Sequence, residues 1–359
     1  MGIYEDLKLI EGEIVDISSI ARALDISQPD IVFHLAAQSF VPHSFVNPLE
    51  TMQINCTGTL NLLEAIRIKS VDPTIVFAGS SEEYGLVISS ENQYKNIKRA
   101  GKTVFPEPEK IPELPIKETN PLRPMSPYAV SKVYGDFLFR NYYHSYGLKT
   151  VVSRAFNHEG AGRGKMFVTA NIALQVMQLK FGEVDRIRIG NVNAFRDWSH
   201  VEDIVKGYCI LALKGKHGEV YNQGSMRTNS VLSYLLLALE AAGYKVRKIE
   251  TFDGGKKVDD PTQLSDSRFF GVKFEKTLID EMLLREEISF ELSDKGINVF
   301  TEKGNIPIEF DPKRFRPAEV PILLSDTEKI HRLGFKVEHS LTEIIRDQLN
   351  YYLDAKRRG

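Results

Sequence analysis

The sequence predicts an α/β fold, a doubly wound parallel sheet joined to a smaller C-terminal lobe. Residues 31–37 and 74–78 are short, nearly continuous apolar runs, which are typical of strands buried on both faces. Segments with apolar residues at helical spacing follow them, at 51–68 and 126–146. Polar residues stand directly after the apolar runs, and α/β sheets place their chemistry at these strand ends. A length of 359 residues suits such a sheet with an added lobe.

The composition excludes several classes of partner. Charged residues make up 26% of the chain, the net charge is -2 and the pI is about 6.5, so nothing indicates attraction to nucleic acid or to a membrane surface. No apolar run approaches the ~18 residues that span a bilayer. Cys56 and Cys209 are too few and too far apart for a disulfide framework or a metal cluster. We therefore expect a cytoplasmic protein with no metal, nucleic-acid or membrane partner.

The expected elements follow the chain in order. The first part should contain a strand at 7–10, a helix at 16–24 with an Asp or Ser cap, strands at 31–37 and 74–78, and a helix at 51–68. The second part should contain helices at 126–146, 168–180 and 230–242, a strand at 150–156, and a strand and turn at 220–225. Three pairs have the spacing of capping boxes, namely Ser199 with Glu202, Ser325 with Glu328, and Ser340 with Glu343. Residues 251–311 have no assignable pattern.

Residues 86–116 form an insertion rich in Lys, Glu and Pro. A surface insertion is the favoured interpretation. Because the segment leaves a strand end that carries polar residues, a lid is the alternative.

Two stretches carry the chemistry. Tyr128 and Lys132 are four residues apart on a predicted helix, which places phenol and ammonium on one face. An ammonium favours the phenolate, so it should lower the tyrosine pKa from about 10 toward neutrality and make the oxygen a base. The other stretch, Ser80-Ser81-Glu82-Glu83, ends the strand at 74–78. Read alone, Tyr and Lys at this spacing occur by chance on many helices, and the two glutamates could be a solvated strand end.

Together the two stretches resemble the extended short-chain dehydrogenase/reductase family and, within it, the nucleotide-sugar 4,6-dehydratases. Four further motifs resemble the GDP-mannose 4,6-dehydratases: Leu-Ala-Ala-Gln-Ser-Phe-Val at 35–41, Phe-Asn-His-Glu with Arg-Gly at 156–164, Arg-Asp-Trp-Ser-His at 196–200, and Phe-Arg-Pro-Ala-Glu-Val at 315–320. Residues 55–59 match the family's Asn-x-x-Gly-Thr, although GDP-mannose dehydratases often lack that asparagine. The resemblance implies a Rossmann-like sheet.

The resemblance also implies a role for each catalytic residue. Tyr128 would take the proton of the sugar 4-hydroxyl, Ser80 would hydrogen-bond the same oxygen, and Lys132 would tune Tyr128 and hold the nicotinamide ribose. Glu82 would remove the C5 proton and so distinguishes a dehydratase from an epimerase. Ser81 stands where dTDP-glucose dehydratases usually carry aspartate and GDP-mannose dehydratases carry serine.

Further residues follow from the same resemblance. The coenzyme is expected to be NADP, with NAD as the alternative, and the substrate a nucleotide-diphosphate sugar. The coenzyme would contact Glu13, Ile14, Leu35, Ala36, Ala37, Ser39, Tyr128, Lys132 and His158. The substrate would contact Ser44, Asn157, Val168, Arg196, Arg316 and Glu319. Arg196 is interpreted as a fork for the diphosphate, although an ion pair with Asp197 is the simpler reading. His34 is interpreted as a core or coenzyme-pocket residue.

We expect a Rossmann-like coenzyme domain at 1–160, which includes the insertion at 86–116 and is rejoined by later segments, and a mainly substrate-binding lobe at 161–359. Family members pair the helix at 126–146 with a second copy, which implies a homodimer or homotetramer. No Gly-x-x-Gly-x-x-Gly turn follows a strand near Met1, so we expect the chain to be N-terminally incomplete and to bind NADP poorly. Alternatives are a dTDP- or CDP-glucose dehydratase, an epimerase, and a non-catalytic remnant.

Overall fold

The computed structural model describes residues 6–359, which form two compact units. Unit 1 holds the chain up to Glu83, Pro124–Arg154 and Tyr208–Tyr221. Unit 2 holds Tyr84–Arg123, Ala155–Gly207 and Asn222–Gly359. The domain division expected from the sequence, at residue 160, stays a prediction.

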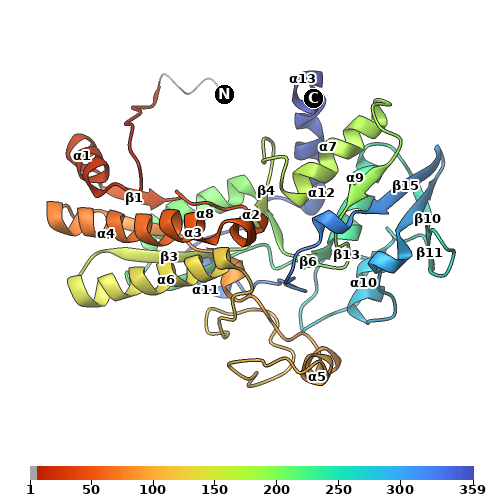
Figure 1. Ribbon diagram of the computed structural model, residues 1–359, viewed down its shortest axis with the longest axis horizontal. Helices are drawn as coiled ribbons and strands as arrows, with labels where there is room; N and C mark the ends of the chain where they lie inside the picture. Colours follow the sequence, from red (N-terminus) through yellow and green to blue (C-terminus); the bar gives the residue numbers. More distant parts are fainter. Residues whose placement is uncertain (1–5) are drawn as a thin grey trace. The chain divides into compact units, whose positions relative to one another are not determined.

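Unit 1 consists of a parallel sheet with packed helices (Figure 1). Its elements are α1 (Ile17–Ser27), β1 (Ile31–His34), α2 (Val41–Val46), α3 (Pro48–Met52), the π-helix η2 (Gln53–Thr57), α4 (Gly58–Lys69), β2 (Thr74–Ala78), the 3-10 turn η3 (Ser81–Glu83), α6 (Pro127–Tyr146) and β3 (Thr150–Ala155). Both α8 (Val201–Lys214) and β8 (Val220–Gln223) cross from one unit to the other along the chain. The strand order is β1-β2-β3-β8, with β1, β2 and β3 parallel.

The core of unit 1 forms where α1, α4 and α6 pack against this sheet. Helix α1 contacts α4, and α6 contacts both α4 and β2. The side chains of Leu63, Ile66, Ile75 and Phe139 are fully buried in this core. The apolar periodicity of the helices and the apolar strand at 74–78 therefore predicted this packing correctly.

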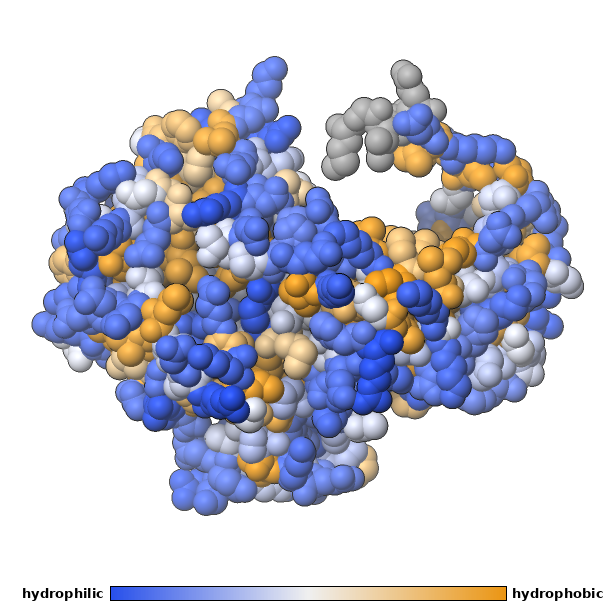
Figure 2. Space-filling view, turned by 180° about the vertical axis from the view of Figure 1, so that it is seen from behind, coloured by the Kyte–Doolittle hydropathy of each residue, from blue (hydrophilic) through white to orange (hydrophobic). Residues whose placement is uncertain are grey.

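The N-terminal edge of the sheet differs from the expectation. Residues 7–10 form no strand, and β1 is only four residues long rather than spanning 31–37. Ile31, Phe33 and Leu35 are 36%, 39% and 58% exposed, so the prediction of a strand buried on both faces is wrong. Among the described residues only β2 pairs with β1, which leaves these side chains on an open edge. Figure 2 shows apolar surface beside the N-terminal segment of this unit.

Unit 2 contains a second sheet, a group of helices and several small strand pairs. Its elements are α5 (Glu91–Arg99), β4 (Asn157–Glu159), α7 (Val168–Lys180), β5 (Ile187–Ile189), β6 (Phe195–Arg196), β7 (Trp198–His200), β9 (Asn229–Ser230), α9 (Val231–Ala241), β10 (Val246–Thr251), β11 (Lys257–Asp259), β12 (Leu264–Ser265), β13 (Lys276–Thr277), α10 (Leu278–Leu284), η4 (Leu292–Asp294), β14 (Gly296–Thr301), β15 (Gly304–Phe310), η5 (Pro312–Arg314), α11 (Glu328–His331), α12 (Leu341–Tyr351) and α13 (Ala355–Arg358).

Helices α7, α9 and α12 pack against one another, and the five-stranded sheet has the order β11-β10-β14-β15-β5 (Figure 1). Its β5–β15 pair is parallel and the other pairs are antiparallel. The segment left unassigned at 251–311 supplies most of the strands of this sheet. Two short pairs, β4 with β7 and β6 with β9, carry the motifs around Asn157 and Arg196.

One of the three expected capping boxes is confirmed, at Ser340 and Glu343. Ser199 lies inside β7, and the first turn of α8 is capped instead by His200, whose Nδ1 accepts the backbone N–H of Glu202 at 3.2 Å. Ser325 also caps no helix, because its hydroxyl donates to Asp197 Oδ2 at 2.5 Å. Spacing alone cannot tell a capping serine from one inside a strand. In residues 6–359, none of the helices has the length and apolar character required to cross a membrane.

Candidate active site

The predicted catalytic residues of unit 1 lie at the end of β2 and the start of α6. Ser126 caps α6, its Oγ accepting the N–H of Ala129 at 3.0 Å, and Pro127 occupies the first turn. Tyr128 and Lys132 follow on the same face of the helix. Gly79 lets the chain turn after β2, because a Cβ there would lie 2.7 Å from both Glu83 Oε1 and the carbonyl of Ser153.

The structure brings Tyr128, Ser80 and Glu82 together. The phenol of Tyr128 is hydrogen-bonded to the side chain of Ser80, and Glu82 is near enough for its charge to raise the pKa of Tyr128. Burial is the largest cause and also raises this pKa, whereas the Ser80 hydrogen bond lowers it. The expectation that Lys132 lowers the pKa of Tyr128 is wrong in this structure. The Lys132 Nζ instead donates to the carbonyl of Ala78 at 2.7 Å and lies 5.8 Å from the centroid of the Tyr128 ring.

A buried group of charges beneath Lys132 was not predicted. Glu83, Asp136 and Arg154 are almost fully buried, with Arg154 Nε 2.8 Å from Asp136 Oδ2 and 3.3 Å from Glu83 Oε2. Burial raises the pKa of Glu83 and lowers the pKa of Lys132 to about 8, while the charge of Glu83 acts to raise the pKa of Lys132. Glu83 also accepts the N–H of Ser80 at 2.7 Å, so it fixes the turn that presents the two serines.

Ser81 and Glu82 form η3 together with Glu83. Ser81 is buried, and the backbone N–H of Glu82 donates to Ser80 Oγ at 3.2 Å. This tight turn places two hydroxyls and a carboxylate within three successive residues next to the phenol. The arrangement can supply two bases, the Tyr128 phenol and the Glu82 carboxylate, and a hydrogen-bond donor, Ser80. The role of each residue stays a prediction.

The predicted coenzyme residues of unit 1 line the open end of β1 and the segment before α1. Leu35, Ala36 and Ser39 are exposed and Ala37 is partly exposed, while Glu13 and Ile14 lie in the turn where Ile14 packs over Gly58 of α4. Asn55 in η2 binds this loop to α6, since its side chain accepts the N–H of Gln38 at 2.8 Å and donates to Ser131 Oγ at 2.9 Å. A π-helical turn at this point is a frequent mark of a functional site.

His34 is a satisfied core residue. Its Nε2 lies 2.9 Å from Thr59 Oγ1, and its ring stacks on Phe139 with centroids 6.2 Å apart. Ser44, a predicted substrate residue of unit 1, is buried and its hydroxyl donates to the carbonyl of Val41 at 2.7 Å.

The remaining predicted residues belong to unit 2. Asn157 has a buried Oδ1 without a hydrogen-bond partner among the described residues, which suits a polar ligand. His158 Nδ1 donates to the carbonyl of Phe156 at 3.0 Å, and burial lowers the pKa of His158, so its Nε2 is an acceptor. Val168 begins α7, whose N-cap Phe167 makes no side-chain cap, so the first amides of this helix are available to an anion.

Arg196, Arg316 and Glu319 lie together in unit 2. Arg196 donates to Glu319 Oε1 at 2.7 Å and to the carbonyl of Val320 at 2.7 Å, and Arg316 Nη1 is 3.9 Å from Glu319 Oε1. The suggested ion pair between Arg196 and Asp197 is wrong, because Asp197 accepts hydrogen bonds from Ser225 and Ser325 instead. The structure therefore groups the three predicted residues, with Arg196 Nη2 bound to the Glu319 carboxylate.

The parallel sheet of unit 1, with a tyrosine, lysine and serine group at its strand ends, defines a protein of the dinucleotide-dependent α/β class. Residues 2–224 match the model of the NAD dependent epimerase/dehydratase family, and the chain belongs to this family. It is 30% identical over 341 residues to GDP-mannose 4,6-dehydratase of Yersinia enterocolitica, covering 94% of this chain and 77% of that protein. It is 31% identical over 350 residues to GDP-mannose 4,6-dehydratase of Vibrio cholerae, covering 97% and 79%.

The fold is similar to a solved structure of RMD from Pseudomonas aeruginosa complexed with NADPH. The TM-score is 0.69 at 24% sequence identity, and the match covers 96% of this chain and 89% of that one. This likeness confirms the doubly wound α/β fold predicted from the sequence.

The residues present fit one end of a dinucleotide. Tyr128 lies beside Ser80, Lys132 follows it one turn later on α6, and the small side chains of Ala36, which is exposed, and Ala37, which is partly exposed, leave the end of β1 accessible. These groups suit the nicotinamide and its ribose. None of the strands described in residues 6–359 is followed by a Gly-x-x-Gly-x-x-Gly turn, so the pyrophosphate has no such cradle there.

Proposed function

We propose that the chain is a nucleotide-sugar 4,6-dehydratase, a lyase that converts GDP-mannose to GDP-4-keto-6-deoxymannose. The observation that carries the proposal is Glu82, a carboxylate beside the Tyr128 phenol and Ser80 at the end of β2. Relatives named GDP-mannose 4,6-dehydratase, 30% and 31% identical over most of the chain, support the choice of substrate. NADP is the proposed coenzyme, with NAD as the alternative.

Each residue of unit 1 then moves or holds a proton. Tyr128 accepts the proton of the 4-hydroxyl while Ser80 holds the same oxygen, and the buried Lys132 supplies positive charge below them. The nicotinamide, when bound, supplies the acceptor and later the donor of the hydride. Oxidation at C4 makes the C5 proton acidic, and Glu82 removes this proton and passes it to the C6 hydroxyl, which leaves as water while Ser81 hydrogen-bonds its oxygen. The C5–C6 double bond that remains would then take the hydride back at C6 and a solvent proton at C5.

Residues of unit 2 would hold the sugar nucleotide. Arg196 and Arg316 offer guanidinium groups to the diphosphate, Glu319 offers an acceptor to the nucleotide ribose, and Asn157 has a buried polar atom to satisfy. We assign 1–160 mainly to the coenzyme and 161–359 mainly to the sugar nucleotide. Helix α6 exposes Val130, Tyr134 and Phe137, which supports its use in a homodimer or homotetramer.

The test follows the two proton transfers separately. The protein and its Tyr128→Phe and Glu82→Gln variants are incubated with GDP-mannose and NADP in deuterated water, and products are identified by mass. The parent should form a product 18 mass units lighter, apart from deuterium, because water is lost. Tyr128→Phe should lose about 100- to 10,000-fold in turnover, the usual contribution of a general base, while GDP-mannose still binds.

Glu82→Gln should still oxidise C4 but incorporate no deuterium at C5, and reduced coenzyme should accumulate. A Glu82→Gln variant that forms the 6-deoxy product at the parent rate would exclude the dehydratase mechanism. An epimerised sugar without loss of water would assign the chain to the epimerases of its family.

A further inference from the structure

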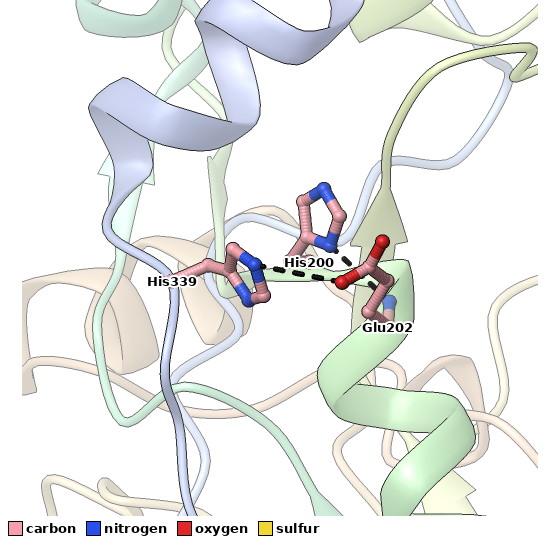
Figure 3. A group of neighbouring side chains, drawn as sticks. All are labelled: His200, Glu202 and His339. Carbon is pink, nitrogen blue, oxygen red and sulfur yellow. Dashed lines mark hydrogen bonds and ion pairs between the residues drawn. The ribbon is translucent and has the colours of Figure 1, made fainter.

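Three side chains with metal-binding atoms converge in unit 2, apart from the residues assigned above. Figure 3 shows His200, Glu202 and His339 facing a common space. His200 ends β7, Glu202 lies in the first turn of α8, and His339 directly precedes Ser340, the N-cap of α12. Each residue offers one ligand atom, and these atoms all lie within 4.8 Å of one another.

Two carboxylates hold the outer nitrogens of the imidazoles. His339 Nδ1 lies 2.9 Å from Asp203 Oδ1, and His200 Nε2 lies 3.3 Å from Asp347 Oδ2. A carboxylate only accepts, so it binds the nitrogen that carries the proton, and the other nitrogen of a neutral ring keeps its lone pair as an acceptor or a metal ligand. Asp203 is fully buried and also accepts from the backbone N–H groups of Glu338 and His339. This is the outer arrangement that orients histidine ligands in metal sites.

The inner atoms are all electron-pair donors. His339 Nε2 is 3.7 Å from Glu202 Oε2, and the two rings stack with centroids 4.1 Å apart. Without a cation, the lone pair of a neutral His339 ring faces the Glu202 carboxylate, and His200 Nδ1 accepts only the long hydrogen bond from the Glu202 N–H. Full protonation of both rings would place two positive charges in stacking contact, which like-charge repulsion opposes. One bound cation satisfies all three residues at once.

We propose that His200, Glu202 and His339 bind a divalent transition-metal ion of the zinc class. Two imidazole nitrogens and one carboxylate oxygen are ligands that Zn²⁺ accepts, and three protein ligands leave a position for water. The Glu202 side chain is 65% exposed and can rotate to close the site. The long hydrogen bond of 3.2 Å from the Glu202 N–H to His200 Nδ1 is the contact that the metal replaces.

The ion would join the start of α8 to the segment before α12. His200 and Glu202 are separated from His339 by more than 130 residues along the chain, so the bond would restrain two distant parts of unit 2. We assign it a structural role, and no step of the sugar reaction passes through it.

The experiment titrates the chelator-treated full chain with ZnCl₂ by calorimetry at pH 7.5 and follows thermal unfolding. One ion per chain should bind and raise the unfolding temperature, whereas MgCl₂, which prefers oxygen ligands, should do neither. Glu202→Gln and His339→Ala should each weaken Zn²⁺ binding by about 10-fold or more. His331→Gln changes an exposed histidine of the same unit outside the group and should bind Zn²⁺ like the parent.

Glu202 is exposed, so Glu202→Gln should fold normally and circular dichroism checks this. Saturable Zn²⁺ binding that both variants retain would overturn the proposal, because the ion would then bind elsewhere. Absence of saturable Zn²⁺ binding by the parent chain would also overturn it, and the group would then be an ion pair and hydrogen-bond network without a metal.

Discussion

At the residue scale, burial in the core of unit 1 determines the protonation state of His34. Burial lowers the pKa of His34 from 6.5 to about 3, and the nearby charge of Lys132 lowers it further. The ring is therefore neutral in the folded protein and bonds Thr59. In the unfolded chain the same ring has a pKa near 6.5.

This difference predicts an acid-sensitive stability. Between pH 6.5 and pH 3 the unfolded chain binds a proton that the folded chain excludes, so the stabilising contribution is present above pH 6.5 and is lost as the pH falls. The loss from pH 8 to pH 5 should be about 2 kcal/mol. Urea unfolding of the parent and of His34→Gln at both pH values measures it. The variant should lose about 2 kcal/mol less than the parent, and equal losses would contradict the prediction.

Residue types and spacing predicted part of the site and missed part. The pairing of Tyr128 with Ser80 follows from two recognisable stretches, and the structure brings them together. The pKa directions were not predictable, because desolvation depends on packing that a sequence does not show. Asp136 and Arg154 were missed for a similar reason, although a charged Arg154 inside an apolar strand was a signal that could have been used.

At the scale of elements, α6 carries two of the five predicted catalytic residues, Tyr128 and Lys132, and depends on its first turn. Ser126 Oγ accepts the N–H of Ala129, and α5 has the same kind of cap, in which Ser90 Oγ accepts the N–H of Gln93 at 3.0 Å. The two caps share their chemistry, but α6 contacts the core whereas α5 has no buried residue. They form a matched pair for measuring what a cap contributes.

Ser126→Ala should destabilise the protein by about 1 kcal/mol, the usual loss at an N-cap, and should lower turnover because the first turn holds Tyr128. Ser90→Ala should leave turnover unchanged and destabilise less, because α5 frays without unfolding the core. Urea unfolding and product assays of both variants measure these effects. An equal loss of turnover in both would show that the cap of α6 does not position Tyr128.

Elements with a clear apolar pattern in their own sequence were predicted closely. Strands that depend on pairing with a neighbouring strand were not. The strand at 74–78 and the helix at 168–180 have the expected bounds. The strand at 7–10 was wrong, and β1 ended at His34, because a strand needs a neighbour that periodicity does not supply. The sheet of β10, β14 and β15 had no assignable pattern, since its pairing joins segments of mixed composition.

At the scale of the whole molecule, the open edge at β1 is expected to affect how the chain behaves in solution. An edge strand with apolar side chains is a template for pairing with another chain. Which segments lie at such an edge depends on contacts between residues far apart in the sequence. For this reason the sequence alone predicted the burial of this strand incorrectly.

Phe33→Ser should reduce self-association of the 359-residue chain, because it removes an exposed apolar ring from β1. Phe105→Ser is the control, since Phe105 is an exposed phenylalanine of the 86–116 insertion outside the sheet. Light scattering during heating measures both. A control that suppresses scattering as strongly as Phe33→Ser would exclude the β1 edge as the site of association.

The ion pair between Arg196 and Glu319 would give the proposed diphosphate site a competitor within the protein itself. Any diphosphate that reaches Arg196 must displace a carboxylate tethered in the same unit at a high effective concentration. The measured affinity for the diphosphate is then the affinity of an Arg196 guanidinium that is not paired with Glu319, multiplied by the fraction of molecules in which it is unpaired. Glu319→Gln should therefore tighten the binding of inorganic pyrophosphate in calorimetry. In the proposed function, the displaced carboxylate would bind the nucleotide ribose, so the site would favour a nucleotide over a bare diphosphate, which offers Glu319 no new partner.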